Sequence, residues 1–158
     1  MPRITPSFLF ASESRGAAEF YVTIFPNSKI TRVNYYNEAG PMPAGTVLAV
    51  DFQLDGQDFT AINSGAAFEF NESISFRISC ESQEDVDYYW HRLGEGGEES
   101  SCGWLSDRYG VHWQIVPTEL ERFLGDPDPE RAERAMAAML QMRKLDLAVL
   151  QAAVDQIP

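Results

Sequence analysis

Hydrophobic residues at the start of the chain are spaced first as in a strand and then as in a helix. Ser7–Ser12 is a short apolar run bounded by a proline and polar residues, which predicts a strand. Over Glu13–Phe25 the apolar residues recur at the i, i+3, i+4 and i+7 spacing of one helical face. Ser12 or Ser14 is a candidate cap for this helix, and Pro26 is expected to end it.

Three further strands are predicted after this helix. Lys29–Tyr36, Thr46–Leu54 and Gln57–Asn63 are rich in β-branched and aromatic residues or alternate between apolar and polar. The stretch Asn37–Gly45 contains two glycines and two prolines, so it is expected to be an irregular loop. Asp55-Gly56 is a two-residue hairpin signal, so the last two strands should pair antiparallel.

The second half of the chain repeats this order. A strand at Ile74–Cys80 and a helix at Glu84–Leu93 precede the hairpin of Cys102–Pro117, which turns at Asp107–Gly110. In its returning arm the residues His112–Val116 alternate between two faces. Val111, Trp113 and Ile115 form the packed face, and His112, Gln114 and Val116 form the other. Asp107 and Arg108 are interpreted as residues that hold the turn.

The two halves can be superposed along the sequence. A shift of 68 positions places Ala18–Tyr21 on Val86–Tyr89, and a shift of 54 positions places Thr60 on Gln114. Several matches in one order indicate an internal duplication of a strand–helix–strand–strand–strand unit. We therefore predict one domain over residues 1–158, with unit one at about 4–66, unit two at about 73–117 and a helical tail at about 118–157.

The tail is predicted to contain helices only. Thr118 is expected to cap a short helix at Glu119–Leu124, Pro129 to be the first residue of the next, and Asp146 to cap the last. The apolar stripe of these helices, which includes Met136 and Met139, is expected to be core or partner surface.

Composition limits the function classes. The formal charge of −12 disfavours binding to nucleic acids and to anionic membranes. Cys80 and Cys102 form no disulfide framework and are interpreted as small buried residues, with a reactive thiol as the alternative. The start of the sequence shows no signal peptide and no segment is apolar enough to span a membrane, so a cytoplasmic protein is expected.

No cofactor is predicted. Gly94-Glu95-Gly96-Gly97 follows a helix and is flanked by glutamates, so it is interpreted as a helix end and loop that would repel phosphate. No glycine-rich turn from a strand into a helix is present to bind a dinucleotide or an adenosyl group.

Several motifs resemble one known family. They are Ile4-Thr5-Pro6 with Phe8, Ala18–Tyr21 with Ile24–Ser28, Cys102–Leu105 with Asp107–Gly110, Trp113–Pro117 and Met142–Asp146. In these motifs the chain resembles the PhnB-like branch of the glyoxalase/bleomycin-resistance/extradiol-dioxygenase superfamily, also called the vicinal oxygen chelate superfamily. Such proteins often carry the label 3-demethylubiquinone methyltransferase.

The resemblance implies an α+β fold. Two βαβββ units would form a cupped, eight-stranded, mixed but mainly antiparallel sheet around a cavity, followed by C-terminal helices. It also implies a homodimer. In metal-using relatives four side chains in the cavity hold a divalent ion, and the corresponding positions here are Ser7, Thr60, Ser75 and Gln114. Hydroxyl and amide groups are neutral, weak ligands, so no bound metal is predicted.

Three functional hypotheses remain open. The first is a metal-free protein that binds a small aromatic or planar ligand in an apolar cavity. Ser7, Thr60, Asn63, Ser75 and Gln114 would be its polar anchors, with Trp104 or Trp113 as a stacking wall. The second is a metal-independent enzyme in which His112 acts as the base and Gln114 polarises a carbonyl group. The other histidine, His91, is expected on a helix surface and is therefore not a candidate base. The third is a structural or partner-binding dimer without a ligand.

Overall fold

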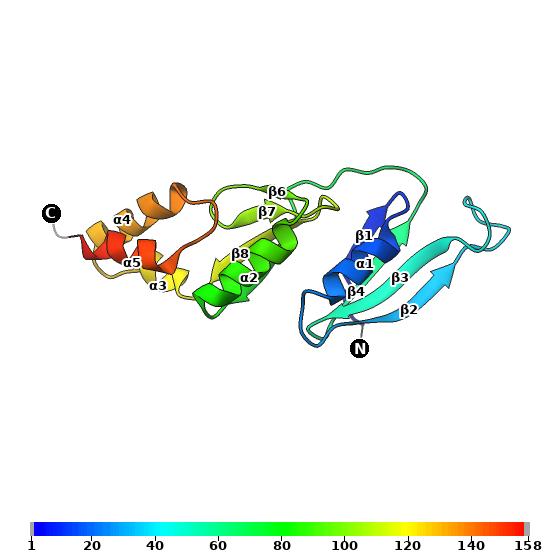
Figure 1. Cartoon of the computed structure of the whole chain (residues 1–158), viewed down its shortest axis with the longest axis horizontal. Coiled ribbons are helices and arrows are strands. Elements are labelled where there is room, and N and C mark those ends of the chain that lie inside the picture. Colours follow the sequence, from blue (N-terminus) through cyan, green and yellow to red (C-terminus); the bar gives the residue numbers. More distant parts are fainter. Residues whose placement is uncertain (1, 157–158) are drawn as a thin grey trace. The chain divides into compact units, whose positions relative to one another are not determined.

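The computed structural model describes residues 2–156 and divides the chain into two compact units, with the boundary between Glu69 and Phe70. Each unit contains one four-stranded sheet with a helix packed on one face (Figure 1). The eight predicted strands are therefore present, arranged as two sheets of four. The unit boundary falls between the two repeats that the sequence predicts, and the helical tail belongs to the second unit.

The first unit has the element order of the predicted repeat. Its elements are β1 (Ser7–Phe10), α1 (Ser14–Val22), β2 (Lys29–Tyr35), β3 (Val47–Leu54) and β4 (Gln57–Asn63). The sheet order is β1-β4-β3-β2, with β1 parallel to β4 and the other pairs antiparallel. The predicted hairpin at Asp55-Gly56 is confirmed, because β3 and β4 pair antiparallel on either side of it.

The core of the first unit lies between α1 and the sheet. Phe52 and Phe59, which are opposite each other on β3 and β4, stack with ring centroids 5.5 Å apart. Phe8 from β1 and Tyr21 from α1 pack on the same rings, at 5.9 Å from Phe59 and 6.2 Å from Phe52 respectively. Alternation along the strands places these aromatic side chains on one face, so the intervening residues Asp51 and Thr60 lie on the face that α1 does not cover.

The prediction that Ser12 or Ser14 caps α1 is wrong. The helix begins without a side-chain cap from its own neighbours. Instead, the Oδ1 atom of Asn63 at the end of β4 accepts a hydrogen bond from the Ser14 backbone N–H at 2.9 Å. A long-range contact takes the place of the local one because the end of β4 lies next to the start of the helix.

The second unit repeats the order with shorter strands. Its elements are β5 (Phe76–Cys80), α2 (Gln83–Gly94), β6 (Glu98–Glu99), β7 (Trp104–Ser106) and β8 (His112–Pro117). The sheet order is β5-β8-β7-β6, again with one parallel pair, β5 with β8. Ser82 caps α2 by accepting a hydrogen bond from the backbone N–H of Asp85.

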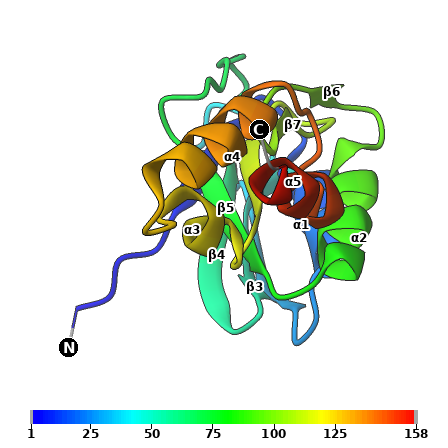
Figure 2. The same cartoon turned by 90° about the vertical axis from the view of Figure 1, so that its left-hand side faces the viewer.

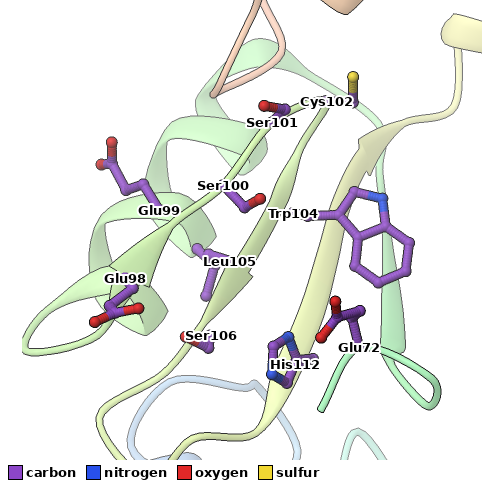
Figure 3. Close-up of a pocket in the computed structure, with 10 residues that line it drawn as sticks. All are labelled: Glu72, Glu98, Glu99, Ser100, Ser101, Cys102, Trp104, Leu105, Ser106 and His112. Atoms are coloured by element: carbon purple, nitrogen blue, oxygen red, sulfur yellow. The ribbon is translucent and has the colours of Figure 1, made fainter.

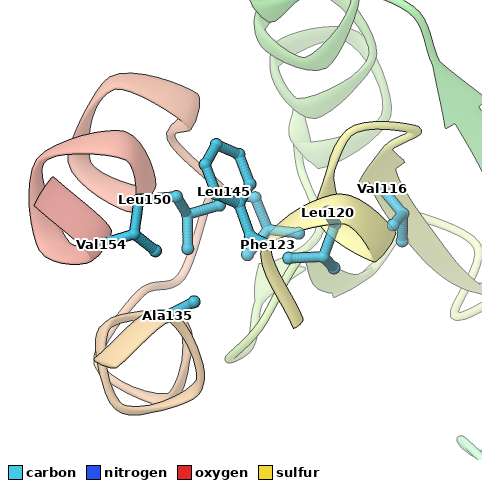
Figure 4. Close-up of a cluster of buried hydrophobic side chains, with 7 residues drawn as sticks. All are labelled: Val116, Leu120, Phe123, Ala135, Leu145, Leu150 and Val154. Atoms are coloured by element: carbon cyan, nitrogen blue, oxygen red, sulfur yellow. The ribbon is translucent and has the colours of Figure 1, made fainter. Parts of the chain in front are cut away.

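Three helices complete the second unit, namely α3 (Leu120–Leu124), α4 (Pro129–Leu140) and α5 (Leu147–Asp155). They pack against one another (Figure 2) around a buried apolar cluster that Figure 4 shows. Its members are Val116, Leu120, Phe123, Ala135, Leu145, Leu150 and Val154. The predicted Met stripe is divided, because Met139 packs on this cluster whereas Met136 is exposed.

The predicted helix starts in the tail are right for two of three helices. Asp128 and Asp146 cap α4 and α5 through their side chains, and Pro129 is the first residue of α4. Thr118 does not cap α3, which begins after Glu119 without a side-chain hydrogen bond. The backbone N–H of Thr118 is bonded instead to the carbonyl of Cys80, which extends the strand pairing. The predicted tail ends at residue 157, which lies outside the described residues.

Candidate ligand-binding site

The uncovered face of the second sheet carries the polar side chains predicted for it. Trp104 on β7 is opposite Gln114 on β8, and Ser106 is opposite His112, so these four side chains share one face. All four are partly buried, whereas Leu105 and Trp113 on the other face are almost fully buried. The alternation predicted for the hairpin is therefore confirmed.

A cavity of about 490 Å³ opens on this face (Figure 3). It is lined by Trp104 and His112 from the sheet, Glu98 and Glu99 from β6, Glu72 from the segment before β5, Cys102, three serines and Leu105. In Figure 3 the Glu72 carboxylate lies beside both the indole of Trp104 and the imidazole of His112. The volume falls within the range of about 300–1,000 Å³ typical of small-molecule sites.

Two of the predicted anchors in this unit contact each other. The Nε2 atom of Gln114 donates a hydrogen bond to the Ser75 hydroxyl at 2.8 Å. Gln114 lies next to the cavity on the same strand as His112 but does not line it. The Gln114 amide is therefore engaged by Ser75 and lies outside the set of side chains that line the cavity.

Two of the three anchors predicted in the first unit, Ser7 and Thr60, lie on the equivalent face of the first sheet. Ser7 is opposite Thr60 in the parallel pair of β1 and β4. The Thr60 hydroxyl donates a hydrogen bond to the Asp51 carboxylate at 2.8 Å, and Arg32 forms an ion pair with the same carboxylate at 2.8 Å. Thr60 and Asp51 also line a smaller cavity of about 300 Å³.

Two residues predicted as ligand contacts are buried away from the cavities. Asn63 is 3% exposed, and its side chain bonds the backbone of Ser14 and, at 3.1 Å, the carbonyl of Val47. Trp113 is 2% exposed, and its indole N–H donates to Asp107 at 2.8 Å. These contacts give Asn63 and Trp113 a structural role. The tryptophan that lines the larger cavity is Trp104.

The turn of the hairpin is held as predicted. Besides the indole of Trp113, the Asp107 carboxylate accepts hydrogen bonds from the backbone N–H groups of Tyr109 and Val111. Arg108 donates to the carbonyl of Glu95 at 3.1 Å, which ties the turn to the end of α2. His91 is exposed on α2, as expected.

The two cysteines have different environments. Cys80 is 1% exposed, and burial, followed by the nearby Asp85 carboxylate, raises the pKa of its thiol to about 11. Cys102 is partly exposed and lines the cavity, with its Sγ atom 3.6 Å from the carbonyl oxygen of Met139. The expectation of two buried residues therefore holds for Cys80, while Cys102 belongs to the site.

The backbone at Cys102 is fixed by the tail. The N–H groups of Cys102 and Gly103 donate to the carbonyls of Met142 and Arg143 at 2.9 and 2.7 Å. Cys102 and Gly103 both have a positive φ, of 58° and 84° respectively. The sequence carries no periodic signal for this contact, since Met142 and Arg143 lie in the loop between α4 and α5.

The residues at the four positions that the superfamily resemblance assigns to metal ligands do not fit a divalent ion. They are the hydroxyls of Ser7, Thr60 and Ser75 and the amide of Gln114, two of which are bonded to each other. Within residues 2–156 there is also no group of three or more His, Cys, Asp or Glu residues arranged to hold a metal. The carboxylate nearest to Thr60, that of Asp51, is already neutralised by Arg32.

The two βαβββ units and their open polar faces define a protein of the glyoxalase/bleomycin-resistance/extradiol-dioxygenase, or vicinal oxygen chelate, superfamily. The model of one family, described as 3-demethylubiquinone-9 3-methyltransferase, matches residues 2–116. A solved structure described as a 3-demethylubiquinone-9 3-methyltransferase, PhnB protein, from Bacillus cereus is 32% identical, with a TM-score of 0.68 over 74% of this chain and 100% of that chain. The chain belongs to this PhnB-like family.

Other solved structures share the fold. Protein PA1353 from Pseudomonas aeruginosa is 17% identical, with a TM-score of 0.62 over 74% of this chain and 98% of that chain. The fosfomycin resistance protein FosX from Listeria monocytogenes, solved with Mn(II) and sulfate, is 15% identical, with a TM-score of 0.51 over 78% of this chain and 95% of that chain. Among curated proteins no match was found.

The family match ends at residue 116, so α3, α4 and α5 follow the matched region. The tail motif Met142–Asp146 is therefore not tested by that match. No helix within residues 2–156 has the length and hydrophobicity that crossing a membrane requires.

Proposed function

We propose that this protein binds a small planar or aromatic ligand, without a resident metal, in the cavity on the open face of its second sheet. The observation that carries the proposal is the cavity of about 490 Å³ in which an indole, an imidazole and carboxylates converge. Small-molecule sites are usually lined mainly by apolar side chains, with a few polar groups that orient the ligand. Here most of the lining residues are polar, so the cavity is less apolar than the sequence predicts. Trp104 is its aromatic wall, and His112 and Ser106 are polar groups beside it.

A planar ligand is favoured because a partly exposed indole offers a flat apolar surface. Aromatic pairs gain about 0.5–1.5 kcal/mol beyond the area that they bury. Trp90 and Trp113 cannot take this role, since they are 7% and 2% exposed and each indole N–H is bonded to a carboxylate, of Glu99 and Asp107 respectively.

The metal-free part of the proposal rests on the chemistry of the donors. FosX from L. monocytogenes was solved with Mn(II). Here Ser7, Thr60, Ser75 and Gln114 carry no charge that would offset the dehydration of a divalent cation. Elemental analysis of protein purified without chelators should give less than one equivalent of any transition metal per chain.

Methyl transfer is not part of the proposal, although the family description names it. Within residues 2–156 three connections lead from a strand into a helix, namely Ala11–Glu13, Glu81-Ser82 and Thr118-Glu119. None of them contains a glycine that would let the backbone approach an adenosyl group or a phosphate closely.

The direct test measures quenching of tryptophan fluorescence by aromatic ligands. Quenching in the wild-type protein should disappear in Trp104→Leu, because the other two tryptophans are buried in the packed face. Trp104→Phe should retain binding measured by calorimetry, since it retains a ring. Equal affinity in the wild type and in Trp104→Leu would show that the ligand binds elsewhere.

A metal-independent enzyme is the second candidate, because His112 lines the same cavity. An imidazole is the side chain best suited to accept a proton from a ligand at neutral pH. If catalysis occurs, His112→Ala should abolish turnover while ligand binding to Trp104 persists.

We also propose a homodimer, as the superfamily resemblance implies, and sedimentation equilibrium would measure its mass.

A further inference from the structure

The cavity of the second unit carries a strong excess of negative charge. Three of the ten residues that line it are glutamates, and none is a lysine or an arginine. The whole chain is acidic as well, with a formal charge of −12. A concave surface lined by one sign of charge concentrates ligands of the opposite sign.

The three glutamates differ in how far the protein itself uses them. Glu99 accepts a hydrogen bond from the indole N–H of Trp90 at 2.9 Å and lies 4.0 Å from the guanidinium of Arg143. The side-chain carboxylates of Glu72 and Glu98 form no hydrogen bond or ion pair with any residue in the described range 2–156. Glu99 therefore has a structural role, and Glu72 and Glu98 are the carboxylates whose charge a ligand would meet.

These two carboxylates lie on either side of the aromatic wall. Glu98 is opposite Ser106 at the β6 edge, whereas Glu72 comes from the segment that precedes β5, at the other edge of the sheet. Between them lie Trp104 on β7 and His112 on β8, and Figure 3 shows Glu72 next to both rings. A ligand stacked on Trp104 would therefore be within the field of both carboxylates.

The indole of Trp104 also attracts cations. The face of a tryptophan ring carries partial negative charge and binds cations, ammonium groups included, more strongly than other aromatic rings do. Isolated surface glutamates would be an ordinary solvated face, but here they surround a cavity with an aromatic wall. Anions are disfavoured by all of these groups.

We propose that the natural ligand of this cavity is an organic cation, a planar ring system that carries a positive charge. This inference rests on the proposed function and specifies the ligand class of the same site. Trp104 takes the ring face, and Glu72 and Glu98 balance the charge. The bound cation supplies the positive charge that pairs with these two carboxylates, since no lysine or arginine lines the cavity.

The test uses three probes with the same ring and different charge. N-methylquinolinium is a permanent cation, quinoline is neutral at neutral pH, and quinoline-2-carboxylate is an anion. Calorimetric titration of the whole protein should give an affinity for the cation at least about tenfold above that for quinoline, a difference of about 1.4 kcal/mol. The anion should bind more weakly than quinoline.

Charge-neutral variants test the two carboxylates separately. Glu98→Gln and Glu72→Gln should each weaken N-methylquinolinium binding by about threefold to tenfold and leave quinoline binding unchanged. Glu133→Gln, an exposed glutamate on α4, is the matched control and should change neither affinity. Raising the salt concentration should reduce the preference for the cation.

The outcomes separate the two proposals. Equal or tighter binding of quinoline or of the anion would overturn the cation inference and leave the planar-ligand proposal standing. Cation binding that is insensitive to Glu72→Gln and Glu98→Gln would also overturn the inference. Failure of all three probes to bind would count against both proposals.

Discussion

The indole N–H of Trp113 donates a hydrogen bond to the Asp107 carboxylate at 2.8 Å, and both side chains are almost fully buried. The same carboxylate accepts two backbone hydrogen bonds inside the turn between β7 and β8. The buried Asp107 side chain therefore connects the turn to Trp113 on the packed face of the sheet. Trp104 and His112 occupy the opposite face of these strands, so the pair supports the cavity from behind.

Asp107→Asn should therefore destabilise the second unit. The amide has only one acceptor oxygen, so at least one buried donor loses its partner, which costs about 1–3 kcal/mol. Urea unfolding followed by tryptophan fluorescence would measure the loss. Asp55→Asn is the matched control, because Asp55 lies in an exposed turn with a positive φ that asparagine tolerates. Equal stability of the two variants would contradict the role assigned to Asp107.

Asn63 should behave as a structural residue of the first unit. Asn63→Ala removes the acceptor for the Ser14 N–H and the donor to the Val47 carbonyl, so a loss of about 1–3 kcal/mol is expected. Asn63→Asp should lose at least as much, because it buries a carboxylate whose second oxygen faces the Val47 carbonyl. Far-UV circular dichroism during urea unfolding would report the change. Asn37→Ala, at an exposed loop residue that bonds the Ala39 N–H, should be close to neutral.

The glycine after Cys102 should tolerate no side chain. Gly103 has a φ of 84°, and an added Cβ would lie 2.7 Å from the carbonyl oxygen of Ile115. Gly110 has nearly the same φ, 82°, but its nearest neighbour would be 3.8 Å away. Gly110→Ala should therefore show only the backbone cost of about 1–2 kcal/mol, and Gly103→Ala should lose distinctly more in a thermal or urea melt. The reverse order would contradict this geometry.

The two thiols should differ in reactivity. Burial raises the pKa of Cys80 to about 11, so its thiolate is scarce at neutral pH, whereas Cys102 is partly exposed in the cavity. Titration of the native protein with a thiol reagent should label Cys102 rapidly and Cys80 slowly, and denaturant should make both reactive. A ligand bound at Trp104 should slow the labelling of Cys102. Peptide mass mapping would identify the modified residue.

The ion pair between Asp87 on α2 and Lys144 in the tail should make a small, pH-dependent contribution to stability. Hydrogen bonds from Lys144, and next from Gln83, lower the pKa of Asp87 below its ordinary value. A carboxylate with a lowered folded-state pKa stabilises the protein above its unfolded pKa, and the contribution is lost as pH falls through the folded pKa. Because both side chains are partly exposed, the contribution is about 0.5 kcal/mol at most.

Unfolding of the wild type and of Asp87→Asn should therefore differ slightly at about pH 7 and converge toward about pH 3. The Lys144→Ala background is the control, since there Asp87→Asn should have almost no effect at either pH. A difference that grows on acidification would contradict the sign of the pKa shift.

The sequence predicted the elements well because their signals are local. The helical spacing of Ala17 and Tyr21 and the alternation at Trp113 are each carried by residues within one element, whose period determines which face is buried. The repeat then predicted the second unit from the first. Helix caps were less predictable, because the N-terminus of α1 is bonded by Asn63, about fifty positions away in sequence.

The candidate site was predicted in part. His112, Gln114 and Trp104 were placed correctly on one face, because strand alternation is sufficient for that. Glu72, Glu98 and Cys102 were missed as cavity residues, since they lie at strand edges or in connections whose positions depend on long-range contacts. The adjacent Glu98 and Glu99 were a usable signal of an acidic site, but from the sequence alone they are interpreted only as a reason against phosphate binding.

The sequence by itself determined the duplicated βαβββ order, the buried face of each strand and the uncharged side chains at the four positions that the resemblance assigns to metal ligands. These are properties of neighbouring residues and of residue type, and they need no knowledge of the fold. Only the tertiary structure decided which polar groups are used by the protein and which remain for a ligand. Hydrogen bonds such as those of Asn63 and Glu99 join segments distant in sequence, and only folding brings their donors and acceptors within bonding distance.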